Sequence, residues 1–263
     1  MFLKFIKKSL SYLIRKLHLA DLESFIYERR VELANIIDKK HHSTIQYGPF
    51  QGMLLSQGGW GKTDRASMIY GFYEQEVLES LTSNKGKYKT LIDVGAADGY
   101  YAIGGLLSGT FEKAICYEIS KEGQDQIKKN ADLNKVSKNI EIRGEAKQNF
   151  YDDFTQEELA TSLILMDIEG VEFDILSKSE DFRKLKNSSL IIESHALFFD
   201  DGKEKQQNLI KLAEEFFNVK ELKMRSRDLS DFPELQKFSD TDRWLMCSEG
   251  RGELMSFFRL DPK

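Results

Sequence analysis

The stretch "LIDVGAADGYYAIG", residues 91–104, decides the fold. An apolar run ends at Asp93, and a turn from Gly95 to Gly99 follows it before a second apolar stretch. Loops are ordinarily polar, whereas this turn carries few side chains, so we expect a ligand to approach its backbone closely. A strand, a bare turn and a helix in this order predict an α/β unit with a binding site at the turn.

Four more short apolar runs follow, namely "KAICYEIS", "NIEIRGEA", "SLILMDIEG" and "SLIIESH", separated by polar stretches that are compatible with helices. Acidic residues at or near the ends of the five runs lie 22 to 27 residues apart: Asp93, Glu118, Glu145, Asp167 and Glu193. A strand, a crossover helix and two loops need about that length, so the spacing predicts consecutive βα units in a parallel sheet. Ligands bind such sheets at the carboxyl ends of the strands, where these acids gather.

The remaining segments complete the predicted architecture. After residue 205 we expect a helix and two closing strands, around "VKELKM" and "RWLMCSE", which would make a mostly parallel seven-stranded sheet with helices on both faces. Residues 1–85 read as a helical segment with helices at "ERRVELANIID" and "YGFYEQEVLESLT", and a glycine-rich loop or hairpin lies between them. The chain is therefore predicted to consist of this N-terminal segment and a binding domain over residues 86–263.

The first 19 residues, "MFLKFIKKSLSYLIRKLHL", have a pattern of their own. Basic residues separate apolar ones that recur at helical spacing: Phe2, Phe5, Ile6, Leu10, Leu13, Ile14 and Leu17. This predicts a basic amphipathic helix. Such a helix can lie on a membrane surface, mediate dimerisation or pack on its own domain, and the pattern leaves all three open.

Composition narrows the class of protein. The chain has 263 residues and a formal net charge of −5, so it lacks the basic field typical of nucleic-acid binders. Two cysteines are too few for a disulfide framework, and no apolar run reaches the length of a membrane span. We expect a reduced cytoplasmic setting, with the inner membrane face as an alternative location, and no nucleic-acid partner.

Two nucleotide-binding motifs fail at single positions. The dinucleotide motif G-x-G-x-x-G needs glycine where Ala97 stands, which disfavours NAD. In "SQGGWGKT" a P-loop would need glycine where Ser56 stands, which disfavours ATP and GTP there.

The strand, the Asp-x-Gly-x-x-x-Gly turn, the helix and the acid at the end of the next strand together resemble the S-adenosylmethionine site of class I methyltransferases, which have a Rossmann-like fold. The resemblance implies that Glu118 accepts hydrogen bonds from the ribose hydroxyls and that Glu145 and Ala146 meet the adenine. The implied cofactor-binding residues are Asp93, Gly95, Ala96, Asp98, Gly99, Tyr100, Glu118, Ile119, Glu145, Ala146 and Asp167. Singly, these acids could equally be helix caps or solvated strand ends.

A narrower resemblance appears when "DVGAADGYYA", "YEIS", "RGEA", "MDIEGVEFDIL" and "IIESH" are taken together. They look like the FkbM-type methyltransferases, in which "DIEG-x-E" follows the fourth strand. This implies an O-methyltransferase that uses S-adenosylmethionine, with a sugar or sugar nucleotide of bacterial surface polysaccharide synthesis as acceptor. A phosphate-containing small molecule, a lipid or a natural product is the alternative acceptor, and a non-catalytic binding module is the alternative class.

Methyl transfer to a hydroxyl needs a base, and His195 is the only histidine at the predicted ligand edge. We hypothesise that His195 takes the proton, that Glu193 or Asp167 orients it, and that Glu169 and Glu172 shape the site. The alternative for Glu172 is that it faces solvent on the helix after the fourth strand. The alternative role for His195 is a backbone hydrogen bond and a cap of the helix that follows His195.

Two further features concern the acceptor. In an alternative mechanism, a divalent metal bound by Asp167, Glu169, Glu193 and His195 would lower the pKa of the acceptor hydroxyl. We do not expect this mechanism to apply. Aromatic and cationic residues beside predicted loops are candidate substrate contacts, namely Trp60, Tyr100, Tyr101, Arg243 and Trp244.

Overall fold

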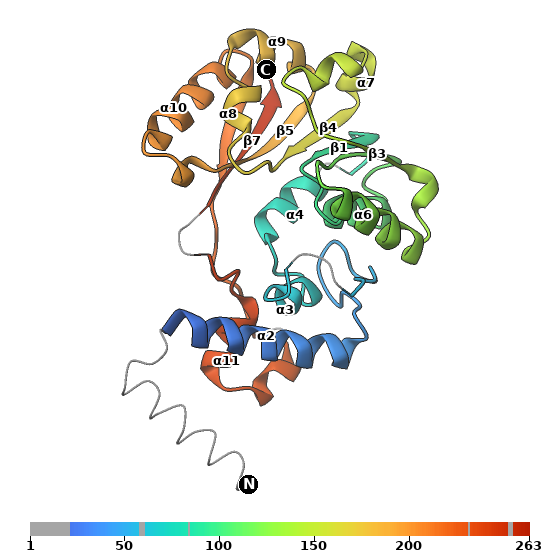
Figure 1. Ribbon diagram of the computed structural model, residues 1–263, viewed down its shortest axis with the longest axis vertical. Helices are drawn as coiled ribbons and strands as arrows, with labels where there is room; N and C mark the ends of the chain where they lie inside the picture. The colour runs from blue at the N-terminus through green and yellow to red at the C-terminus, as the bar shows by residue number, and fades with distance from the viewer. Residues whose placement is uncertain (1–21, 58–60, 84, 231, 252–254) are drawn as a thin grey trace, which may run out of the picture.

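A seven-stranded sheet forms the centre of the computed structural model, which describes residues 22–57, 61–83, 85–230, 232–251 and 255–263 (Figure 1). Its strand order is β3-β2-β1-β4-β5-β7-β6. The strands are β1 Thr90–Val94, β2 Lys113–Tyr117, β3 Ile140–Arg143, β4 Ser162–Met166, β5 Ser189–Ser194, β6 Phe217–Leu222 and β7 Ser256–Pro262. The first five are parallel, and β7 runs antiparallel to both of its neighbours. The predicted fold class is confirmed.

Both faces of the sheet are buried, because successive strand residues enter different hydrophobic clusters. In β1, Leu91 belongs to one cluster and Ile92 to the other. The helices that follow the first strands and cover the sheet are α5 Tyr100–Leu107, α6 Lys121–Leu133, α7 Gln156–Ala160, α8 Glu172–Ile175, α9 Ser179–Leu185 and α10 Gly202–Ala213. Residues of α5 and α6 pack on the face of Leu91, and residues of α7 to α10 pack on the face of Ile92. Near-continuous apolar strands are what a doubly covered parallel sheet requires.

The N-terminal segment is helical, as predicted. Its described helices are α2 Leu22–His41, α3 Arg65–Ile69 and α4 Gln75–Thr82. In the loop between α2 and α3, Thr44 and Leu54 form an isolated antiparallel bridge. Leu33 and Ile37 of α2 are fully buried in the cluster that also covers one face of the sheet.

The prediction of a closing strand at "RWLMCSE" is wrong. Those residues belong to α11 Asp240–Cys247, and the closing strand is β7. Ser239 caps α11, since its hydroxyl accepts a hydrogen bond from the Asp242 N–H at 3.2 Å, and acidic residues occupy the first turn. The helix packs on α2 (Figure 1), where Arg29 binds the Asp242 carboxylate with two nitrogens at 2.8 and 2.6 Å.

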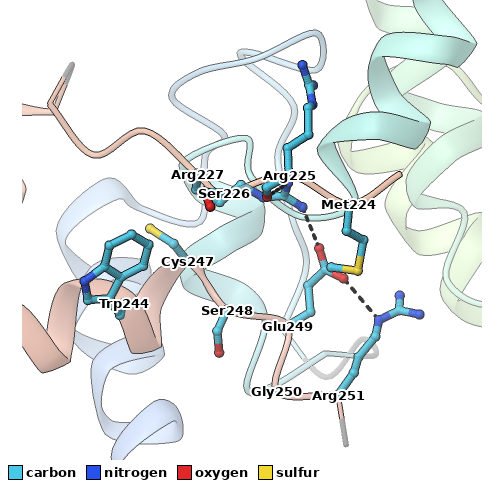
Figure 2. Close-up of a pocket in the computed structure, with 10 residues that line it drawn as sticks. All are labelled: Met224, Arg225, Ser226, Arg227, Trp244, Cys247, Ser248, Glu249, Gly250 and Arg251. Atoms are coloured by element: carbon cyan, nitrogen blue, oxygen red, sulfur yellow. Dashed lines mark hydrogen bonds and ion pairs between the residues drawn. The ribbon is translucent and has the colours of Figure 1, made fainter. Parts of the chain in front are cut away.

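Residues 223–255, which we call the β6–β7 insertion, contain the short helix η4 Pro233–Lys237 and α11. Two parts of the insertion face a cavity of about 400 Å³ (Figure 2). The residues around it are Met224, Arg225, Ser226, Arg227, Trp244, Cys247, Ser248, Glu249, Gly250 and Arg251.

In the described part of the chain, no helix is both long and apolar enough to cross a membrane. The predicted amphipathic helix over residues 1–19 and the candidate contact Trp60 lie outside the described residues.

Candidate functional site

The glycine turn packs tightly against the neighbouring strand. Gly95 has a φ of 92°, and a Cβ there would lie 1.7 Å from the carbonyl oxygen of Asp167. Gly99 has a φ of 82° and begins α5. The absence of a side chain at Gly95 is therefore already required by the close approach of the chain after β4, whether or not a ligand lies against the turn.

Asp93, near the end of β1, precedes this turn and is 2% exposed. Its carboxyl group takes a hydrogen bond from the backbone of Ala102 in α5, while its Oδ2 atom has no hydrogen-bond partner within the described residues. Burial raises the pKa of Asp93 to about 7. Asp93 thus joins β1 to α5 through this hydrogen bond, and it does not line the cavity described next.

A cavity of about 530 Å³, which we call the glycine-turn cavity, opens above the ends of β1, β2 and β4. The predicted cofactor residues that line it are Gly95, Glu118, Ile119, Glu145, Ala146 and Asp167. Tyr73, Ala97, Tyr117, Ser120, Ile168, Glu169 and Val171 complete the lining. Most of the predicted cofactor residues are therefore brought together at one edge of the sheet.

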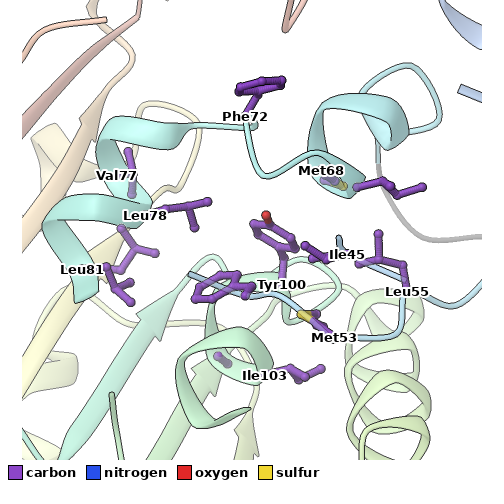
Figure 3. Packing of buried hydrophobic residues seen from close by; sticks show 14 of the residues in the cluster. Ile45, Met53, Leu55, Met68, Phe72, Val77, Leu78, Leu81, Tyr100 and Ile103 are labelled. Atoms are coloured by element: carbon purple, nitrogen blue, oxygen red, sulfur yellow. The ribbon is translucent and has the colours of Figure 1, made fainter. Parts of the chain in front are cut away.

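The other predicted cofactor residues do not line this cavity: Asp93, Ala96, Asp98, Gly99 and Tyr100. Tyr100 is 6% exposed and lies within the hydrophobic core (Figure 3), where its ring meets that of Phe50 edge to face at 5.2 Å. The Asp98 carbonyl accepts a hydrogen bond from the Asn130 side chain at 2.8 Å. In this structure these residues shape the turn and the start of α5.

Glu118 is held in place from two directions. Its Oε2 accepts a hydrogen bond from the Ala97 N–H at 2.9 Å, and its Oε1 accepts one from the Ser120 N–H at 2.8 Å. A Cβ at Gly123 would lie only 2.7 Å from the Glu118 Cγ, so this glycine in α6 makes room for the carboxylate. Each carboxylate oxygen keeps a further lone pair for a ligand. Sequence reasoning missed Gly123, although a glycine in the first turn of a helix was a visible signal.

A second cavity, of about 480 Å³, adjoins the first, and we call it the histidine cavity. Its lining consists of Tyr73, Glu74, Asp167, Glu169, Glu193, His195, Leu197, Phe198, Arg251 and Met255. All four predicted catalytic residues line it. Tyr73, Asp167 and Glu169 line both cavities, so a molecule in one would meet a molecule in the other there.

His195 is oriented by Glu172. The Glu172 Oε1 accepts a hydrogen bond from the His195 backbone N–H at 2.7 Å and lies 3.2 Å from its Nδ1. The Nε2 atom lies 3.4 Å from Asp167 Oδ1 and 3.6 Å from Glu169 Oε2. The His195 side chain makes no cap of the next helix, and the expectation that Glu172 could face solvent is wrong, because Glu172 is fully buried.

The ionisable groups of the histidine cavity shift the pKa values of their neighbours. Burial would lower the pKa of His195, but the hydrogen bond to Glu172 and nearby carboxylates outweigh it and raise that pKa above its usual value. Burial and, next, the proximity of Glu193 raise the pKa of Asp167 well above its usual value. A hydrogen bond between Asp167 and Glu193 contributes to raising the pKa of Asp167.

Arg251 is a further residue of the histidine cavity that sequence reasoning missed. Its Nη1 lies 2.5 Å from Glu193 Oε1, its Nη2 pairs with Glu74, and its Nε lies 3.1 Å from Glu249 Oε2. Burial, followed by Glu193, raises the pKa of Glu74 to about 7. Arg251 is distant in sequence from Glu74 and Glu193, so no local pattern indicated their association.

One atom from each of Asp167, Glu193 and His195 lies within 4.8 Å of the others, so these three side chains could hold a metal ion. Two carboxylate oxygens and an imidazole nitrogen form a donor set that suits a divalent cation. These three side chains therefore have a suitable geometry for the alternative, metal-dependent mechanism.

The candidate substrate contacts fall in different places. The Tyr101 hydroxyl donates a hydrogen bond to Glu74 at the edge of the histidine cavity. Arg243 pairs with Asp240 at 2.8 Å, and Trp244 is half-exposed beside the cavity of the β6–β7 insertion. Neither of these α11 residues lines the histidine cavity.

No protein-family model matches the sequence, and no curated protein matches it either. Solved structures do. The ribosomal protein L11 methylase of Lactobacillus delbrueckii subsp. bulgaricus is 17% identical, with 80% of this chain and 85% of that chain covered and a TM-score of 0.48. The precorrin-6y C5,15-methyltransferase of Geobacter metallireducens GS-15 is 9% identical, with coverages of 80% and 94% and a TM-score of 0.46.

Sp1610 of Streptococcus pneumoniae, solved in complex with S-adenosyl-L-methionine, is 18% identical, with coverages of 71% and 72% and a TM-score of 0.46. All three TM-scores are below 0.5, so the fold assignment rests on the strand order and register given above. By that order and register, the chain has a Rossmann-like fold with a mostly parallel seven-stranded sheet.

Proposed function

We propose that this protein is an S-adenosylmethionine-dependent O-methyltransferase that acts on a hydroxyl of a sugar or sugar nucleotide. The observation that carries the proposal is the junction of the two cavities at Asp167, with Glu118 on one side and His195 on the other. A methyl donor and a hydroxyl acceptor need two such adjoining sites. The resemblance of residues 93–102 and 166–176 to FkbM-type motifs supports the same activity.

The glycine-turn cavity suits the cofactor. Glu118 has the lone pairs to accept both ribose hydroxyls, and Glu145 with Ala146 would meet the adenine. Ile119 is 72% exposed at the rim, so its apolar side chain is free to cover the adenine ring. The amino-acid part would lie against the backbone at Gly95.

The transfer proposed for the histidine cavity is an in-line displacement. The acceptor oxygen forms a bond to the methyl carbon while the bond from that carbon to sulfur breaks, and the product is S-adenosylhomocysteine. His195 Nε2 takes the hydroxyl proton, and Glu172 stabilises the resulting imidazolium through Nδ1. A base in this position typically contributes about 10²–10⁴-fold to the rate.

The charge of the histidine cavity favours an uncharged acceptor group. Carboxyl groups of Glu74, Asp167, Glu169 and Glu193 line it, and Arg251 is already paired with two of them. Sugar hydroxyls can donate hydrogen bonds to carboxylates, whereas a phosphate would be repelled. For a sugar nucleotide, we therefore infer that the sugar enters this cavity and the phosphates stay outside.

The decisive assay is transfer of isotopically labelled methyl from S-adenosylmethionine to a panel of sugars and sugar nucleotides. We expect His195→Asn to lower kcat by about 10²–10⁴-fold, while the same substitution at the exposed His42 leaves it unchanged. A kcat within a few-fold of wild type in His195→Asn would reject His195 as the base. An added chelator tests the metal alternative, because loss of activity restored by a divalent ion would make His195 a metal ligand instead.

Binding of the cofactor is tested separately by calorimetry with S-adenosylhomocysteine. We expect Glu118→Ala to weaken binding roughly a hundred-fold or more, since two hydrogen bonds to a carboxylate are lost. Glu122→Ala, which removes an exposed carboxylate in the first turn of α6, is the matched control and should bind normally. Unchanged affinity in Glu118→Ala would place the cofactor elsewhere.

A further inference from the structure

Arg251 is the only arginine or lysine among the described residues that line the histidine cavity. Its carboxylate partners are almost fully buried: Glu74 is 3% exposed and Glu193 is 3% exposed. Buried carboxylates that are not offset by a cation create a strong negative potential. Arg251 therefore sets how negative the cavity is beside Asp167, where the two cavities meet.

The position of Arg251 is fixed by the chain before it. Arg30 of α2 donates a hydrogen bond to the Ser248 carbonyl at 2.8 Å. Gly250 has a φ of 63° and lies so close to Arg30 that a Cβ would be 1.7 Å from the Arg30 Nη1. Glu249 then reaches back to Arg251, as Figure 2 shows. This packing delivers the guanidinium to the carboxylates and holds it there.

We propose that Arg251 is a positioning residue that sets the balance between binding of the cationic methyl donor and of its neutral product. The proposal rests on the proposed function. S-adenosylmethionine carries a positive sulfonium, and S-adenosylhomocysteine carries no charge on its sulfur. Carboxylates where the two cavities meet attract the positive sulfonium of the donor but not the uncharged sulfur of the product. Arg251 offsets that attraction. Excess attraction would stabilise the donor before the reaction without stabilising the transition state equally, which slows transfer.

Arg227 provides a matched control within the same insertion. It is 7% exposed and joins Glu76 at 2.5 Å and Glu249 at 3.0 Å. Like Arg251, it pairs with more than one carboxylate, including Glu249, but its side chain is more deeply buried than that of Arg251 and it does not line the histidine cavity. A purely structural effect of losing a paired arginine should therefore appear at least as strongly in the Arg227 variant, and the effect on cofactor charge only at Arg251.

The test is calorimetric titration of the full-length protein with S-adenosylmethionine and with S-adenosylhomocysteine at low ionic strength and about pH 8.5. The quantity of interest is the Kd of the neutral product divided by the Kd of the cationic donor. We expect Arg251→Gln to raise this ratio roughly three- to ten-fold, as removal of one nearby unit charge does at an intermediate dielectric. Arg251→Lys should restore the wild-type ratio, and Arg227→Gln should keep it.

Glu74→Gln removes a negative charge from the same cavity, so its ratio should fall, which tests the proposal even if Arg251→Gln does not fold. An unchanged ratio in Arg251→Gln and Glu74→Gln, or an equal rise in Arg227→Gln, would overturn the proposal. Failure of the wild-type protein to bind either compound would instead overturn the proposed function, and this inference with it. Added salt should shrink the effect, because the charges are partly screened.

Discussion

Glu172 determines how His195 can act. It is fully buried, and its carboxylate accepts hydrogen bonds from the backbone N–H groups of His195 at 2.7 Å and Gly170 at 2.8 Å. Removing water from around both groups strengthens their mutual attraction. His195 therefore has a fixed ring orientation, with Nδ1 toward Glu172 and Nε2 toward the cavity.

The raised pKa of His195 predicts a pH-dependent rate. Only the neutral imidazole can accept a proton, so kcat/KM should rise with pH through this pKa, which lies above 6.5. Glu172→Gln removes the charge that contributes most to raising the pKa, so the rising limb of the pH–rate profile should move to lower pH. Glu169→Gln, at a more distant and exposed carboxylate, should move it less. If the rising limb does not move in Glu172→Gln, then the pH dependence of the rate does not reflect deprotonation of His195.

Some residues of the candidate site could be located from the sequence, and others could not. His195 and Asp167 could be placed because each follows an apolar run, and parallel strands end at one edge. Glu172 was named as a residue that shapes the site, but its burial could not be predicted, because it depends on a backbone reversal with positive φ at Glu169 (55°) and Gly170 (102°). A helical pattern from residue 172 onward gives no hint of that reversal. Which predicted cofactor residues contact the cofactor stays a prediction.

At the level of elements, the strands were predictable and the closing segment was not. Five apolar runs at βα spacing are strong evidence because they agree with one another. "RWLMC" by itself suits a strand or a helix, and its strand reading ignored Ser239 as a cap and the acids Asp240 and Asp242 in the first turn. Packing on α2 then buries Met246 and Cys247 on one side of α11.

A substitution in the turn between β1 and α5 can test why this turn carries so few side chains. Gly95→Ala would force a side chain into the Asp167 carbonyl at a φ of 92°, so we expect a loss of roughly 3 kcal/mol or more in the free energy of unfolding. For a domain of this size, that lowers Tm by roughly 5–10 °C. Calorimetric or circular-dichroism melting without any ligand measures it.

Gly144→Ala is the control for that experiment, because a Cβ there meets nothing within 4 Å. Its Tm should stay close to that of the wild type. If Gly95→Ala melts normally but loses S-adenosylhomocysteine binding, then the bareness of the turn serves the ligand alone, as the sequence suggested, and the packing explanation fails.

Across the whole molecule, segments distant in sequence share one structure. Helices α2 and α11 pack together, and residues from both belong to the cluster that covers the sheet. Lys40 of α2 also pairs with Glu234 of η4. No local pattern predicts contacts between residues 194 or more positions apart, so the sequence did not indicate that the β6–β7 insertion packs on α2.

The close contact of Gly250 with Arg30 has a thermodynamic consequence. Arg30 of α2 binds the Ser248 carbonyl, and Arg251 binds carboxylates of the histidine cavity. Only Glu249 and Gly250 separate Ser248 from Arg251 along the chain. Any molecule that favours the present arrangement of that cavity must also favour the docked position of α2, and the coupling is equal in both directions. Occupancy of the cavity should therefore slow amide hydrogen exchange in α2, far from the sheet edge where the occupant sits.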